Sequence, residues 1–289
     1  RDLHSFPTRR SSDLNAGIIE LTDLAPGTYG VVLSANPSIL ALGLPNDTPR
    51  AFAVITVTNS DIQNLVFAMS PPPLISGRIK VEGQLPAGTG LNRLLARTVP
   101  SDPSTTLLSN SMTAMNSIVQ NAPTNADGTF SLVGVPNGQY RVTMATLSPG
   151  LYLKEARLNG IDAITIPVRL SGSGELEVVV SSRGGQIDGR LTNQNPLPGG
   201  AMQAVLVPNT SRDRPELFKS TTTDRDGRFT FSSITPGDYK VFVWEALEPY
   251  TYFDPDVLMR FEKDGKAVHV DESSRQVVEV TVIPAEGAQ

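Results

Sequence analysis

One short motif occurs three times in this chain, and each copy opens a run of alternating apolar residues. The motif is Gly-x-Tyr after a Pro or Asn, at Gly27–Tyr29, Gly138–Tyr140 and Gly237–Tyr239. Upstream of the last two copies lies an Asp-Gly pair, Asp127-Gly128 and Asp226-Gly227, with the Asp thirteen positions before the Tyr in both. Matches at fixed offsets indicate a repeated structural unit, which constrains the fold more than any single residue does.

Both parts of the motif predict turns of an antiparallel β protein. An Asp-Gly pair between strand-like runs predicts a tight hairpin, because Gly accepts positive φ and Asp tolerates it. The Gly-x-Tyr turn predicts a crossing between two sheets, after which the Tyr begins the next strand. We expect each Tyr hydroxyl to bond the backbone near its turn, as in the tyrosine corner of Greek-key sandwiches. These residues are therefore interpreted as structural.

Composition supports an all-β chain and excludes several classes of function. The chain has 24 Gly and 23 Pro, and its apolar runs are rich in Val, Ile, Thr and Leu, which is typical of short strands. A net charge of −5 without clustered basic residues predicts no nucleic-acid partner. No apolar run reaches the roughly 18 residues of a transmembrane helix. The absence of Cys excludes disulfides, Cys-ligated zinc and thiol catalysis.

The sequence divides into a foreign segment and three units. Residues 1–14 resemble the translation of a sequencing-library adapter, so we expect them to be non-native and exclude them from fold reasoning. Residues 15–70 are expected to be the C-terminal part of a truncated β-sandwich, whose upstream half the adapter replaces. Residues 71–183 and 184–289 then hold two complete sandwiches of about 100 residues each. A stiff spacer, Pro71-Pro72-Pro73, separates the first unit from the second.

Several elements are expected from local patterns. Strands are predicted at 18–21, 28–33, 51–57 and 62–69 in the first unit, at 91–97 in the second, and at 276–283 in the third. The polar stretch 101–125 fits either a short helical turn or a long loop. A short helix is predicted after Asp254, which can accept from free N–H groups, with Pro255 at the first helical position.

Three motifs together carry a resemblance to a known family. Gly-Arg followed by Ile or Leu at 77–79 and 189–191, Asp-Gly-x-Phe, and Pro/Asn-Gly-x-Tyr resemble carboxypeptidase regulatory-like domains. These are transthyretin-like (prealbumin-like) seven-stranded Greek-key β-sandwiches, and collagen-adhesin B-type repeats share two of the turns. The resemblance implies an extracytoplasmic location in a larger bacterial envelope protein. It also implies a non-catalytic spacer or interaction role beside neighbouring domains of the same longer chain, without a cofactor.

Candidates for chemistry are few. A zinc carboxypeptidase site needs at least two His with a carboxylate, and His269 is the one His outside the adapter-like segment. A Ser-His-Asp triad of His269, Asp271 and one of many Ser lacks a nucleophile elbow. Asp224 and Asp226 are weak calcium candidates, since the twelfth position of an EF-hand loop would be Thr235 rather than Glu. We therefore predict no enzyme.

The best candidate for recognition is an aromatic group in the third unit. It consists of Trp244, Tyr250, Tyr252 and Phe253, whose rings could stack on a sugar or anchor a protein or peptide partner. The alternative is a loop-and-helix cap over the end of the third sandwich. An exposed, concave row of rings would favour binding, whereas buried rings would favour the cap.

Overall fold

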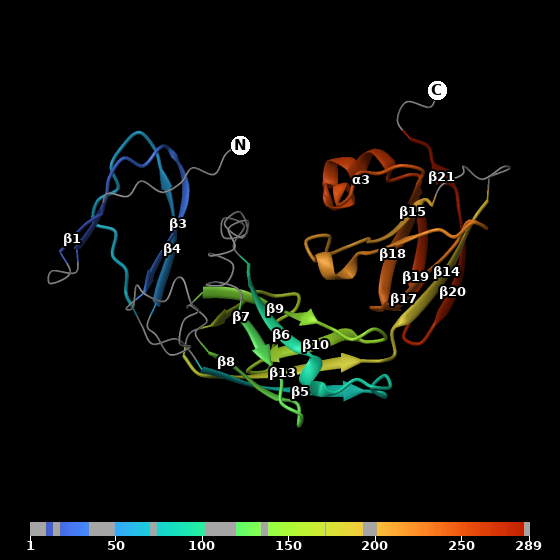
Figure 1. The fold of residues 1–289 in the computed structure, drawn as a ribbon, viewed down its shortest axis with the longest axis horizontal. Coiled ribbons are helices and arrows are strands. Elements are labelled where there is room, and N and C mark those ends of the chain that lie inside the picture. Colours follow the sequence, from blue (N-terminus) through green and yellow to red (C-terminus); the bar gives the residue numbers. More distant parts are fainter. Residues whose placement is uncertain are drawn as a thin grey trace.

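The computed structural model describes residues 10–13, 18–34, 50–69, 74–101, 120–133, 138–170, 172–192 and 201–285. Within these ranges the chain is all-β, apart from short 3₁₀ turns and one α-helix, α3 (Pro255–Phe261). Figure 1 shows the elements gathered into a small N-terminal ribbon region and two larger groups of strands.

The N-terminal region consists of two ribbons. β1 (Arg10–Asp13) pairs antiparallel with β2 (Ile18–Leu21), and β3 (Gly27–Ser34) pairs with β4 (Arg50–Val57). The strand predicted at 62–69 is wrong, because these residues form no strand and Val66 is largely exposed. Asn64 has a φ of +59°, which interrupts an extended backbone. The adapter-like segment lies outside the described residues except for β1.

The middle sandwich, Leu74–Ser181, has a five-stranded sheet in the order β11-β10-β13-β5-β8 and a four-stranded sheet in the order β12-β9-β6-β7. One buried apolar cluster, from Ile75 to Val180, fills the space between them. The sheets exceed the seven strands expected because a β10–β11 ribbon extends the edge of β13. The strands are β5 (Leu74–Glu82), β6 (Leu95–Pro100), β7 (Gln120–Pro123), β8 (Thr129–Val133), β9 (Gly138–Thr146), β10 (Tyr152–Leu158), β11 (Ile161–Asp162), β12 (Val168–Leu170) and β13 (Gly174–Ser181).

The C-terminal sandwich, Gly185–Ile283, has one sheet in the order β17-β14-β20 and a second in the order β16-β15-β18-β19, with β21 beside β18. A second apolar cluster, from Ile187 to Val282, lies between them. The strands are β14 (Gly185–Leu191), β15 (Gln203–Pro208), β16 (Lys219–Thr222), β17 (Arg228–Ile234), β18 (Gly237–Trp244), β19 (Lys266–Val270), β20 (Arg275–Val280) and β21 (Val282–Ile283).

Two predicted strands have different bounds. The single strand expected at 276–283 is two strands, since β20 pairs with β14 in one sheet and β21 pairs with β18 in the other. The apolar alternation continues across the switch because Val278, Val280 and Val282 all face the shared core. The strand expected at 91–97 starts instead with a 3₁₀ turn, η2 (Leu91–Arg93). Of the stretch 101–125, residues 102–119 lie outside the described residues, and β7 begins at Gln120.

The Asp-Gly turns cross between sheets, which corrects the hairpin prediction. The turns close as expected, with Asn125 N donating to Thr129 O at 2.7 Å and Asp224 N to Arg228 O at 2.8 Å. However, β7 and β8 belong to different sheets, and so do β16 and β17. After the turn at Asp127 a single bridge, between Thr124 and Phe130, precedes the divergence of the strands.

The tyrosine corner is formed in the first and third copies of the motif. The Tyr29 hydroxyl donates to the Ala25 carbonyl at 2.6 Å, and the Tyr239 hydroxyl donates to the Thr235 carbonyl at 2.7 Å. Burial raises the pKa of Tyr239 to about 12. Tyr140 is also buried, and the turn at 134–137 before it lies outside the described residues. In each copy the motif Gly is the first residue of its strand.

The Gly of the Gly-Arg motif contacts the Phe of the Asp-Gly-x-Phe motif in both sandwiches. Gly77 on β5 lies opposite Phe130 on β8, and Gly189 on β14 lies opposite Phe229 on β17. A Cβ added at Gly77 would lie 2.2 Å from the Phe130 ring, and one added at Gly189 would lie 2.0 Å from the Phe229 ring. The ring therefore covers the glycine backbone in both sandwiches, so each motif requires the other.

Candidate functional site

The aromatic group lies on the outer face of a sheet of the C-terminal sandwich. The central strands β15 and β18 are apolar on both faces, because one face meets the sandwich core and the other meets a cap. The cap consists of η3 (Pro215–Leu217), η4 (Thr251–Phe253) and α3. The buried cluster beneath the cap contains residues of both strands, of β21 and of the cap segment: Val205, Val207, Phe218, Phe242, Trp244, Tyr252, Leu258 and Ile283.

Two of the four predicted ligand-binding rings are core residues of this cap. Trp244 is 1% exposed and Tyr252 is 7% exposed, so neither presents a ring face to solvent. The Trp244 ring stacks on Phe242, with centroids 5.2 Å apart, and meets the Phe261 ring edge-on at 5.9 Å. The Trp244 Nε1 is buried without a hydrogen-bond partner among the described residues. Packing, rather than recognition, accounts for these two rings.

The other two rings reach the surface. Tyr250 is 72% exposed, and Phe253 is 37% exposed with its centroid 4.9 Å from that of Phe218. Tyr250 has a φ of +70°, a left-handed conformation that costs a bulky residue about 1–3 kcal/mol. The aromatic candidate is thereby reduced to Tyr250 and Phe253.

The cap is held at both ends of its helix. Asp254 caps the first turn by accepting from the Asp256 N–H at 2.8 Å, as the sequence predicts. At the other end the Glu262 carboxylate accepts from Arg212 at 3.0 Å and from Lys240 Nζ at 2.7 Å. Sequence reasoning missed this second anchor, since Arg212 and Lys240 come from distant loops and strands.

The calcium candidates are turn residues. The Asp224 carboxylate accepts from the backbone N–H groups of Asp226 and Arg228, at 2.9 and 2.8 Å. In the middle sandwich Asp127 accepts from the hydroxyl and backbone N–H of Thr129, which lowers the pKa of Asp127. In the part of the chain that the structure describes, no three His, Cys, Asp or Glu side chains gather as a metal site would require.

We expect Asp224→Ala to lower the free energy of unfolding by about 1 kcal/mol, because two backbone N–H groups lose their acceptor. The neighbouring change Asp226→Ala should alter it by less than about 0.5 kcal/mol, since it leaves both of these hydrogen bonds intact. Urea unfolding with and without calcium measures both. A calcium-dependent gain in stability that either substitution abolishes would instead establish a cation site.

His269 is not arranged as the base of a Ser-His-Asp triad. Its Nδ1 lies 2.7 Å from Asp238 Oδ1 and its Nε2 lies 3.3 Å from Asp271 Oδ1, and the carboxylates of Asp238 and then Asp271 raise the pKa of His269. The nearby Ser274 hydroxyl donates to the Asp271 carbonyl at 2.8 Å. Both imidazole nitrogens face carboxylates, so the hydroxyl is not activated by this His.

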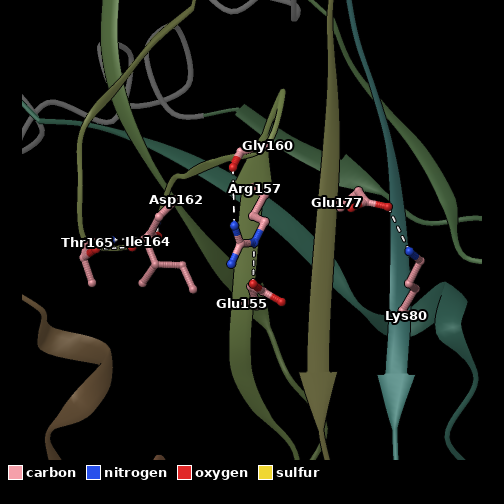
Figure 2. A network of polar contacts seen from close by, with 8 residues as sticks. All are labelled: Lys80, Glu155, Arg157, Gly160, Asp162, Ile164, Thr165 and Glu177. Atoms are coloured by element: carbon pink, nitrogen blue, oxygen red, sulfur yellow. Dashed lines mark hydrogen bonds and ion pairs between the residues drawn. The ribbon is translucent and has the colours of Figure 1, made fainter.

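A further polar network belongs to the β10–β11 ribbon. Figure 2 shows the Asp162 carboxylate turned toward Ile164 and Thr165, and the Arg157 side chain beside Glu155. Asp162 accepts from Ile164 N at 2.8 Å and from Thr165 N at 3.3 Å. The contacts fix the end of the ribbon on the surface of the middle sandwich.

Among the described residues, no helix has the length and apolar content that crossing a membrane requires.

Comparison with known proteins gives distant sequence relatives. No family model matches the chain. An alignment over 138 residues, which covers 44% of the chain, has 28% identity to the serine-aspartate repeat-containing protein D of Staphylococcus aureus strain Newman. The same protein of strain MW2 is also 28% identical. The chain spans 10% of the length of these curated relatives.

Pilins are among the solved structures that are similar to this chain. The minor pilin of Streptococcus agalactiae aligns with a TM-score of 0.35 and 15% identity, covering 75% of this chain and 99% of the pilin chain. A streptococcal ancillary pilin aligns with a TM-score of 0.33 and 15% identity, covering 92% of this chain and 76% of the pilin chain. These scores are low, so the all-β fold rests on the chain's own sheets and cores.

Proposed function

We propose that this chain is part of a larger secreted or cell-envelope bacterial protein, in which tandem β-sandwiches act as non-catalytic spacer or partner-binding domains. The observation that carries the proposal is the repetition of one scaffold with the same glycine–phenylalanine contact and the same pair of turns. Residues 71–183 and 184–289 are proposed as two domains of the carboxypeptidase regulatory-like type, following a truncated copy at 15–70.

The candidate chemical groups support a role without catalysis. Asp224 stabilises a turn, His269 lies between two carboxylates, and Trp244 packs in a core. The distant match to a serine-aspartate repeat-containing protein of Staphylococcus aureus agrees with a bacterial repeat protein. The extracytoplasmic location itself rests on the family resemblance of the turn motifs.

Protease accessibility tests the location. An antibody against the C-terminal sandwich would follow the protein in the bacterium that carries the gene, before and after the outer layers are permeabilised. We expect an external protease to cleave it on intact cells, or once the envelope is permeabilised while the cytoplasm stays closed. Protection until complete lysis, alongside a cytoplasmic marker, would contradict the proposal.

A second candidate function is carbohydrate or peptide binding at the cap. The observation in its favour is the exposed Tyr250 ring, which the fold holds in a left-handed conformation beside Phe253. Such strain at an exposed residue is often found at functional sites. A glycan and peptide array probed with the wild-type chain and with Tyr250→Ala tests it, and equal signals from both would exclude this surface.

A further inference from the structure

The connection between the two sandwiches is short and hydrogen-bonded on both sides. Three residues, Ser182 to Gly184, join β13 to β14. On the side of the middle sandwich, Ser182 N donates to the Glu82 carbonyl at 3.0 Å. On the side of the C-terminal sandwich, Ser273 N donates to the Arg183 carbonyl at 2.8 Å. The connector backbone is thus hydrogen-bonded to both sandwiches.

The two glycines after Arg183 lie too close to the C-terminal sandwich to carry a side chain. A Cβ added at Gly184 would lie 2.7 Å from the Cα of Ser233, which is main chain. One added at Gly185 would lie 2.2 Å from a methyl carbon of Val270. The chain therefore enters the C-terminal sandwich pressed against two of its strands, unlike a flexible Gly-rich linker.

A polar cluster lies beside the connector and spans the joint, the region around residues 182–184 where the two sandwiches meet. Lys154 on β10 bonds Glu82 at 2.7 Å and Glu272, in the β19–β20 loop, at 2.6 Å. The Tyr152 hydroxyl donates to the same Glu272 carboxylate at 2.9 Å. The Arg183 guanidinium bonds Glu82 at 3.0 Å. One glutamate of the C-terminal sandwich is thereby held by two side chains of the middle sandwich.

A second contact crosses the joint from the other sheet. Arg141 on β9 forms an ion pair with Asp213, in the loop that follows β15. The neighbouring Arg214 side chain is 13% exposed. Burial raises the pKa of Asp162 on the middle sandwich, but hydrogen bonds from Thr165 and Ile164, and after them the charge of Arg214, lower it overall. Because β10 and β9 belong to different sheets, the side chains of Lys154 and Arg141 contact the C-terminal sandwich at two separate places.

We propose that the middle and C-terminal sandwiches form one rigid body, whose fixed angle is set by the Lys154–Glu272 and Arg141–Asp213 contacts on either side of the paired connector. Motion between domains is the default where an interface is small and polar. Here the connector is bonded to both neighbours, and the Lys154 and Glu272 side chains are each 35% exposed, against 64% and 51% for the surface pair Arg190–Glu279. The inference deepens the proposed spacer role, but its test is made on the purified chain.

Spin-label distance measurements test the rigidity directly. The chain has no Cys, so Arg169→Cys and Val277→Cys place one label on each sandwich of the full chain. Both positions are exposed. We expect a single narrow distance distribution, and a clearly broader one when Lys154→Met and Asp213→Asn are introduced together. Circular dichroism melts establish that the variants remain folded.

A matched control separates the joint from ordinary surface charge. Lys80→Met removes the ion pair of Lys80 with Glu177, 2.8 Å apart across β5 and β13 within the middle sandwich (Figure 2). It should leave the distribution unchanged. A broad distribution in the parent chain would overturn the rigid body, and one that stays narrow after both joint substitutions would overturn the role assigned to the two contacts. Neither outcome bears on where the protein is located, which protease accessibility decides.

Discussion

Trp244→Ala is expected to lower the free energy of unfolding of the C-terminal sandwich by about 3–5 kcal/mol, the range for truncating a large buried aromatic side chain. Trp244 packs between Phe242 and Phe261 and joins β18 to the cap. Its removal leaves a cavity on the outer face of the sheet, which η4 and α3 cannot close without moving. Trp244→Phe should cost less, because it keeps a ring there and removes an indole N–H that lacks a partner.

Urea unfolding followed by far-ultraviolet circular dichroism measures the effect. The chain has a single Trp, so fluorescence reports the cap in the parent protein and is lost in the variant. Tyr250→Ala is the matched control, since its ring lies in solvent and its removal opens no core. A Trp244→Ala chain as stable as its parent would contradict the core assignment.

Gly189→Ala is expected to destabilise the same sandwich by about 3 kcal/mol, the upper part of the range for overpacking a core. The added methyl would lie 2.0 Å from the Phe229 ring, in a strand where neither backbone can withdraw without breaking the β14–β17 ladder. Gly77→Ala should have a similar effect in the middle sandwich, where the distance to the Phe130 ring is 2.2 Å.

A double-mutant cycle isolates this contact. Phe229→Leu removes part of the ring and should itself destabilise by creating a cavity. In the double variant the Ala methyl occupies part of that cavity, so the combined loss should be smaller than the sum of the single losses. Strictly additive losses in urea unfolding would show that the ring and the glycine do not exclude one another.

The sequence predicted those features that depend on local chemistry. The tyrosine corner follows from a Pro-Gly turn before Tyr239, and the helix start follows from Asp254 and Pro255. The alternation of apolar residues also predicted which side chains of the last strand point inward, since Val278 and Val282 are both buried in the core. It could not show that the backbone changes sheets between them, since side-chain periodicity is the same in either sheet.

Features that depend on distant partners were not predictable from one sequence. The Phe130 ring covers Gly77, and Lys240 meets Glu262, only once the strands are arranged. Trp244 and Tyr252 lie in one buried cluster whereas Tyr250 is exposed, and composition cannot tell a ring that faces solvent from one that packs under a helix. The continuous apolar run Val241–Trp244 was the available signal, since a strand exposed on one face would alternate.

The tight joint at Gly184 and Gly185 has a consequence for how such chains can be duplicated and recombined. A repeat that is copied into a new position keeps its own turns and its Gly–Phe contact. It does not keep the partners of Glu272, or the close fit of Gly184 against Ser233, unless its neighbour is copied with it. The fit at the joint is therefore a property of the pair of sandwiches, although the sequence repeat is one sandwich long.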